Sequence, residues 1–282
     1  MSSRDALVVG GGTMGTGIAY VLGLSGHAVT MVEPDETRAA AALTEIAQAA
    51  RKAADRGRLD PGTAADLPTR IRTANDLGAA PRNAAVAIEA VPERTELKHR
   101  VLAAMEATEP ELLATNTSGL PVTGLAEPLR DPARFLGLHF FNPVWSMPLV
   151  EIVVGEQTAG RTVETARELV AAFGKESITV RDAPGFATSR LGIAIGLEAM
   201  RMLEDGVAAA ADIDKAMELG YRHPMGPLRL SDLVGLDVRL DIARHLARTL
   251  GPRFEPPRIL VDLVAEGKLG KKTGHGFYDW TT

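Results

Sequence analysis

The 282-residue sequence contains no cysteine. This absence excludes a disulfide framework, a thiolate metal site and a cysteine nucleophile, and no metal site is expected. It fits a reducing compartment. The sequence also lacks an excess of positive charge, because 36 Asp and Glu residues outnumber 31 Lys and Arg residues and leave a net charge of −5. Such a balance argues against nucleic acid as a partner and against binding to a membrane surface.

The first apolar stretch of the chain, residues 6–24, is too interrupted to serve as a membrane anchor. It holds six glycines and lacks the run of about 20 strongly apolar residues that a transmembrane helix requires. The charged n-region and cleavage pattern of a signal peptide do not frame it. We therefore expect a soluble protein located in the cytoplasm.

The order of apolar patterns predicts the fold class. Up to about residue 180, short β-rich runs alternate with segments of helical length. The expected strands are 6–10, 28–32, 85–89, 112–116, 135–138, 149–154 and 176–180, and the expected helices include 13–25, 36–57, 93–108 and 161–173. This alternation predicts an α/β fold, a Rossmann-type doubly wound and mostly parallel sheet with helices on both faces.

The pattern changes after "DAPGF", residues 182–186. From there the apolar residues recur at helical spacing, and Gly and Pro punctuate the segments. We expect an all-helical C-terminal domain. The predicted domains are residues 1–183 and residues 184–282.

A glycine pattern near the N-terminus indicates a dinucleotide site. Gly10, Gly12 and Gly15 form G-x-G-x-x-G after a β-rich run and at the start of a helix, and the next strand ends in Glu33. The glycines allow a tight turn, a close approach to a pyrophosphate and close packing of the helix on the strand. Glu33 can accept hydrogen bonds from both ribose hydroxyls and would repel a 2′-phosphate. The sequence therefore favours NAD over NADP.

"HFFNPVWSMPLVEI" contains a candidate acid–base pair. His139 follows the expected strand 135–138, and Glu151 lies in the next strand. Glu151 could hold one imidazole nitrogen and raise the basicity of the other, which would suit the base of a dehydrogenase. A buried ion pair that only ties two strands together fits the same spacing. Spacing alone leaves both interpretations open.

Two further stretches carry polar groups that fit two interpretations each. "TNTSGL", residues 115–120, follows a strand, and its hydroxyl and amide groups could hold a substrate oxygen or simply cap a helix. The Ala-rich segment 36–57 ends in a basic cluster that contains Lys52. These cations could bind an anionic ligand, or they could only complement the negative end of the helix dipole.

The chain resembles the short-chain L-3-hydroxyacyl-CoA dehydrogenases, and its length is similar to that of bacterial 3-hydroxybutyryl-CoA dehydrogenases. The resemblance rests on "VVGGGTMGTGIA", "EAVPE", "TNTSGLP", "GLHFFNPV", "LVEIV", "DAPGF", "HPMGPL", "DLVGLD" and "GKKTGHGFY" in the order of the family. It implies an enzyme that interconverts 3-hydroxyacyl-CoA and 3-oxoacyl-CoA with NAD, in fatty-acid or butanoate metabolism. It also implies a homodimer formed through the C-terminal helical domain.

The resemblance assigns roles to individual residues. His139 matches the catalytic base, Glu151 its orienting partner and Ser118 the serine that hydrogen-bonds the substrate. The implied cofactor contacts are Gly10, Gly12, Thr13, Met14, Gly15, Glu33, Glu93, Lys98, Ser118, Asn142 and Lys272. Glu33 stands where the family usually has aspartate. Lys52 is expected to meet the phosphates of CoA.

One position departs from the family pattern. Relatives carry an asparagine after "PGF" that contacts the acyl substrate, and Ser189 stands in its place. A hydroxyl is shorter and makes fewer hydrogen bonds than a carboxamide. The sequence therefore leaves the identity of the acyl group open. Two alternatives follow: a CoA-independent dehydrogenase of a small 3-hydroxy acid of the gulonate or carnitine type, or a dinucleotide-binding protein without turnover.

Overall fold

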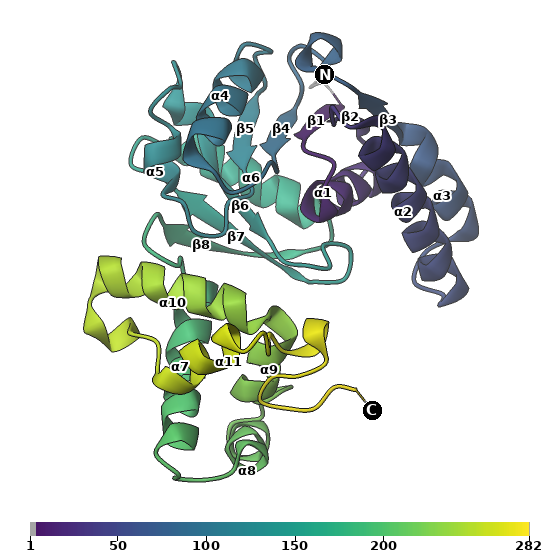
Figure 1. Cartoon of the computed structure of the whole chain (residues 1–282). Coiled ribbons are helices and arrows are strands. Elements are labelled where there is room, and N and C mark those ends of the chain that lie inside the picture. The colour runs from purple at the N-terminus through teal and green to yellow at the C-terminus, as the bar shows by residue number, and fades with distance from the viewer. Residues whose placement is uncertain (1–3, 282) are drawn as a thin grey trace. The chain divides into compact units, whose positions relative to one another are not determined.

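A computed structural model describes residues 4–281. The chain forms two compact units, Met1–Asp182 and Ala183–Thr282. Each unit has its own hydrophobic core, and Figure 1 labels the elements of both.

The first unit is built on one eight-stranded sheet. Its strands are β1 (Asp5–Val9), β2 (Ala28–Val32), β3 (Ile71–Ala74), β4 (Val86–Glu89), β5 (Leu112–Thr115), β6 (Phe135–Phe140), β7 (Leu149–Val154) and β8 (Glu176–Arg181). Its helices are α1 (Thr13–Leu24), α2 (Glu36–Asp55), α3 (Pro61–Asp66), α4 (Thr95–Glu106), α5 (Val122–Leu125) and α6 (Gly160–Ala172), with short 3-10 turns at Leu67–Arg70, Leu77–Ala79 and Pro132–Arg134.

The strand order is β3-β2-β1-β4-β5-β6-β7-β8. Strands β1 to β6 run parallel, whereas β7 pairs antiparallel with β6, and β8 runs parallel to β7. The predicted mostly parallel Rossmann-type sheet is confirmed. Strand β3 is absent from the seven expected strands because "IRTA" is short and only its first residue is fully buried, so it shows no apolar run.

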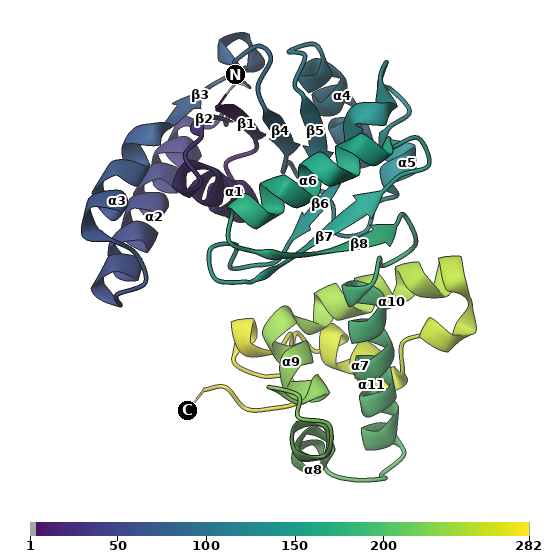
Figure 2. The same ribbon diagram turned by 180° about the vertical axis from the view of Figure 1, so that it is seen from behind.

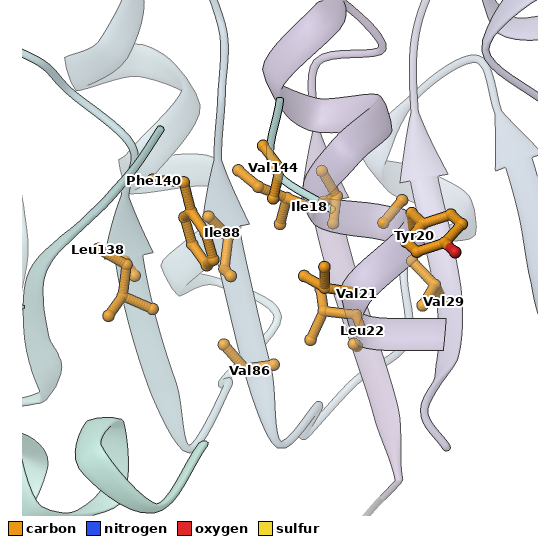
Figure 3. Close-up of a cluster of buried hydrophobic side chains, with 14 of the residues drawn as sticks. Ile18, Tyr20, Val21, Leu22, Val29, Val86, Ile88, Leu138, Phe140 and Val144 are labelled. Atoms are coloured by element: carbon orange, nitrogen blue, oxygen red, sulfur yellow. The ribbon is translucent and has the colours of Figure 1, made fainter. Parts of the chain in front are cut away.

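Helices cover both faces of this sheet. Figure 1 shows α4 in front of the strands, and Figure 2 shows α6 in front of the opposite face. Alternate residues of each strand point to opposite faces. Leu138 and Phe140 of β6 therefore join a cluster with Ile18, Val21 and Leu22 of α1, drawn in Figure 3. His139, between them in the sequence, belongs to the face that carries α4.

The second unit is helical, as predicted. It contains α7 (Thr188–Glu204), α8 (Ala210–Lys215), a π-helical turn (Ala216–Gly220), α9 (Pro227–Val234), α10 (Leu236–Leu250), α11 (Arg258–Ala265) and short turns at Pro252–Phe254 and Lys271–Thr273. In the described part of this unit, β-structure is limited to the isolated bridges Gly270↔His275 and His275↔Asp279.

Two buried carboxylates hold the C-terminal segment of this unit. Asp214 accepts hydrogen bonds from the Leu228 amide and the Tyr278 hydroxyl, at 2.8 and 2.7 Å. Asp232 accepts from the Tyr278 amide and the Trp280 indole, both at 2.9 Å. The stretches "DLVGLD" and "GKKTGHGFY" therefore contain residues that stabilise the fold, because these contacts satisfy charges that are costly to bury.

Within residues 4–281, every helix is too short or too polar to cross a lipid bilayer.

Candidate active site

The glycine turn lines a cavity of about 660 Å³ in the first unit. Gly10 has φ +108°, which side chains rarely tolerate, and a Cβ there would lie 2.6 Å from the Ala90 oxygen. A Cβ on Gly12 would meet nothing within 4 Å, so its backbone faces open space at the start of α1. Thr13 and Met14 also line the cavity. Open space in front of a helix N-terminus fits the pyrophosphate of a dinucleotide.

Glu33 lies at the end of β2 on the wall of this cavity. Its side chain is 6% exposed, and its carboxylate accepts hydrogen bonds from the Gly11 and Asp35 amides at 2.9 and 3.1 Å. Arg38 lies 3.5 Å from the same carboxylate and also lines the cavity. These contacts hold the acid in place, and Oε2, which accepts the bond from the Gly11 amide, has a second lone pair for a ribose hydroxyl.

A buried ion pair contacts Val91, one of the residues that line the cavity. The Lys98 ammonium on α4 lies 2.7 and 3.0 Å from the two carboxylate oxygens of Glu89, and both side chains have no exposed surface. Glu89 also accepts hydrogen bonds from the Thr115 hydroxyl and the Val91 amide, both at 2.6 Å. The structure thus places Lys98 between protein carboxylates. Its direct contact with NAD stays a prediction.

Glu93 connects this pair to the loop that carries Ser118. Its carboxylate lies 3.2 Å from the Lys98 ammonium and accepts hydrogen bonds from the Thr117 hydroxyl and the Ser118 amide, at 2.5 and 3.0 Å. Partial burial opposes ionisation of Glu93, but the Lys98 charge and these hydrogen bonds outweigh it and lower its pKa. An ionised Glu93 fixes the loop and leaves the Ser118 side chain exposed.

His139 and Glu151 form a direct pair. The sequence pattern placed His139 just after the strand. Strand β6 instead continues to Phe140, so His139 lies inside it. The antiparallel register sets His139 opposite Glu151, where side chains share one face. The imidazole Nδ1 lies 2.7 Å from the Glu151 carboxylate. His139 is 5% exposed and Glu151 is fully buried.

The remaining predicted contacts lie in three places. Asn142 is an exposed residue shortly after β6. Lys272, in the second unit, holds both Asp237 oxygens at 2.6 Å. Ser189 lies in the first turn of α7 and is partly exposed. The roles of these three residues in cofactor and substrate binding stay predictions.

The basic cluster at the end of α2 borders a cleft of about 530 Å³ in the first unit. Lys52, Arg56 and Arg58 line it together with the aromatic rings of Tyr20 and Trp145. All three cations are exposed, and none forms an ion pair with another residue in the described range 4–281. The cleft therefore combines unpaired positive charge with flat apolar surface.

Two residues of this site, Glu89 and Arg38, were not predicted from the sequence. Glu89 ends its strand four residues before Glu93, yet its partnership with Lys98 joins a strand to a helix. Arg38 stands in the first turn of α2 and looks like an ordinary helix residue. A charge at the end of a buried strand was the one available indication for Glu89.

The fold and site define a class: an α/β oxidoreductase that binds NAD on a Rossmann sheet. Residues 5–183 match the family model of the 3-hydroxyacyl-CoA dehydrogenase NAD-binding domain, and residues 185–280 match that of the C-terminal domain. The chain belongs to the 3-hydroxyacyl-CoA dehydrogenase family, and NAD is its cofactor.

Relatives cover the whole chain. A 3-hydroxybutyryl-CoA dehydrogenase of Mycobacterium tuberculosis is 40% identical over 284 residues, which cover 97% of both chains. A 3-hydroxyadipyl-CoA dehydrogenase of Escherichia coli is 38% identical over 98% of this chain and 59% of its own length. The crystal structure of (S)-3-hydroxybutyryl-CoA dehydrogenase from Ralstonia eutropha superposes with a TM-score of 0.93 at 34% identity and covers both chains fully.

Proposed function

We propose that this enzyme oxidises (3S)-3-hydroxyacyl-CoA to 3-oxoacyl-CoA with NAD and catalyses the reverse reduction. The observation that carries the proposal is the 2.7 Å contact between His139 and Glu151, on the same unit as the glycine turn and Glu33. A hydride transfer from an alcohol requires a base for the hydroxyl proton, and a histidine held by a carboxylate suits that task.

The residues of the chain divide the work as follows. NAD, when bound, supplies the carbon that accepts the hydride. Glu151 accepts a hydrogen bond from Nδ1 of His139, which assigns the proton exchange with the substrate hydroxyl to Nε2. The Glu151 carboxylate then stabilises the imidazolium that forms. Ser118, whose loop Glu93 holds, orients the substrate oxygen through its hydroxyl.

The substrate class can be tested by comparing thioesters with free acids. NADH oxidation should be measured with acetoacetyl-CoA, with longer 3-oxoacyl-CoAs and with CoA-free 3-oxo acids. We expect kcat/KM for the CoA thioesters to exceed that for the free acids by about 100-fold, because binding energy from the distant CoA group lowers the barrier at the reacting carbon. Comparable rates would instead favour the dehydrogenase of small 3-hydroxy acids.

The basic cleft is the proposed contact for the CoA phosphates. Reversing the charge at Lys52 with Lys52→Glu should raise KM for acetoacetyl-CoA about 10-fold, because phosphate would then meet a carboxylate instead of an ammonium. The Kd for NADH, measured by fluorescence, should not change. Arg51→Glu is the matched control, since Arg51 is exposed on the same helix but does not line the cleft. Equal effects of both substitutions would remove Lys52 from the site.

The helical unit is proposed to bind substrate and to form a homodimer. Large apolar side chains are exposed on it, namely Leu191, Ile195, Val207, Leu219, Tyr221, Leu230, Leu233, Val234 and Val238. Clustered exposed apolar surface marks contact sites between proteins. Sedimentation velocity at micromolar concentration tests the proposal, which a monomer would contradict.

A further inference from the structure

Two aromatic rings form one wall of the basic cleft at the end of α2. Trp145, in the loop between β6 and β7, is partly exposed and lines the cleft beside Pro143 and Ser146 of the same loop. The Tyr20 ring of α1 packs against the indole, with the two ring centroids 5.8 Å apart and the planes inclined by 59°. Tyr20 is only 4% exposed, so it supports the indole from the side of the core. The accessible part of the Trp145 ring is therefore available to a ligand in the cleft.

The loop that carries Trp145 is held from two sides. The Lys175 ammonium, just before β8, donates hydrogen bonds to the backbone carbonyls of Val144 and Met147, both at 2.6 Å. Val144 is 2% exposed and packs so closely on α1 that a Cβ added at Gly17 would lie 2.6 Å from its own Cβ. Because carbonyls on both sides of the turn are held, the indole has a fixed place before a ligand arrives. A ligand that binds there does not have to order the loop, which favours tight binding.

The cations of the cleft complete a surface for a phosphorylated base. Lys52, Arg56 and Arg58 are exposed beside the two rings. An aromatic side chain stacks on the face of a nucleic-acid base, and ammonium and guanidinium groups bind phosphate oxygens. The end of CoA that lies farthest from the thioester has both features, because it is an adenosine with phosphates on its 3′ and 5′ carbons. The residues of the basic cleft differ from those that line the cavity of the glycine turn, so NAD and this end of CoA do not compete.

We propose that the Trp145 indole stacks on the adenine base of CoA while the cations of the cleft bind its phosphates. This inference rests on the proposed function, in which Lys52 meets those phosphates, and it adds a residue that binds the base. Trp145 acts as a specificity-determining residue for the carrier and takes no part in the proton transfer. It distinguishes a CoA thioester from a thioester that lacks the nucleotide, whatever the acyl group.

The kinetic test compares acetoacetyl-CoA with acetoacetyl-pantetheine, which carries the same reacting group but lacks the nucleotide. Trp145→Leu should raise KM for acetoacetyl-CoA about 10-fold, because one stacked base is lost. Its kcat should not change, since the base is bound equally before and during the reaction. KM for acetoacetyl-pantetheine should stay at the wild-type value. Trp145→Phe keeps an aromatic ring and should raise KM for acetoacetyl-CoA by about twofold or less. If Trp145→Leu raised both KM values by the same factor, or neither, the inference would be overturned.

Tryptophan fluorescence tests the contact without turnover. The chain has two tryptophans, and the other one, Trp280, lies in the second unit and donates to Asp232. Adenosine 3′,5′-bisphosphate, added with saturating NAD to fill the cavity of the glycine turn, should quench the emission of the wild type and not that of Trp145→Leu. Equal quenching of both proteins would overturn the inference. Quenching of the wild type alone, without turnover of acetoacetyl-CoA, would refute the proposed reaction and keep the inference. Turnover without quenching would refute the inference alone, and the loss of both would refute both.

Discussion

Replacing His139 with glutamine is expected to lower kcat for acetoacetyl-CoA reduction by about 10³-fold, the usual contribution of a general acid–base group. Glutamine has no proton to exchange near neutral pH, but its amide can still donate a hydrogen bond to Glu151. The variant therefore removes the proton transfer and keeps a donor for a fully buried carboxylate. The Kd for NADH should stay within about twofold of the wild-type value, because His139 does not line the cofactor cavity.

His245→Gln provides the control for this substitution. His245 lies on α10, and no hydrogen bond of its imidazole occurs among residues 4–281, so kcat should be unchanged. Thermal unfolding of both variants should be recorded beside the kinetics. If His139→Gln kept most of the activity but lowered Tm, the pair with Glu151 would be structural, which is the alternative that the sequence left open.

The second large effect concerns stability. Lys98→Met should destabilise the first unit by about 3–5 kcal/mol, because it removes one partner of a buried pair and leaves the Glu89 charge with only neutral donors. For a unit of this size, that corresponds to a decrease in Tm of about 10 °C. Differential scanning calorimetry of the full chain would measure this decrease. Runs with and without NAD would identify the unfolding transition of the first unit, which binds the cofactor.

The control and the rescue use the same unit. Lys52→Met removes an exposed lysine and should change Tm by about 1 °C or less. The double variant Glu89→Gln with Lys98→Met removes both charges and should regain part of the lost stability, since the neutral amide is less costly to bury than a carboxylate. A Lys98→Met variant as stable as the wild type would contradict the ion pair.

Patterns of short range were readable from the sequence. The glycine turn, the helix α1 after it and Glu33 lie within 24 residues, from Gly10 to Glu33, and Gly10 adopts a φ of +108° that a side chain rarely tolerates. Helical spacing after "DAPGF" likewise predicted the second unit, because the period of apolar residues is a local property. The family resemblance then supplied the candidate roles of His139 and Ser118.

The tertiary structure decided whatever depends on pairing between distant segments. The register of β6 against β7 sets His139 opposite Glu151, and a shift by one residue would have turned the two side chains to opposite faces. The packing of α4 on β4 joins Lys98 to Glu89. Consecutive strands suggested the His139–Glu151 pair without fixing its register, whereas the contact between Lys98 and Glu89 has no signature in the spacing of residues along the chain.

The tertiary structure also decided which charged side chains are buried. The stretch "LDVRLDIARHL" contains Arg239, Arg244 and His245. Their spacing does not indicate which of the three side chains is buried. Packing of α10 against α7 leaves Arg244 exposed and covers Arg239. The sequence by itself determined the Rossmann sheet, the helical unit, the family and the candidate residues, because these follow from local pattern. Which charges are paired, which are buried and which remain without a partner follows only from the folded chain, since the cost of a charge depends on what surrounds it.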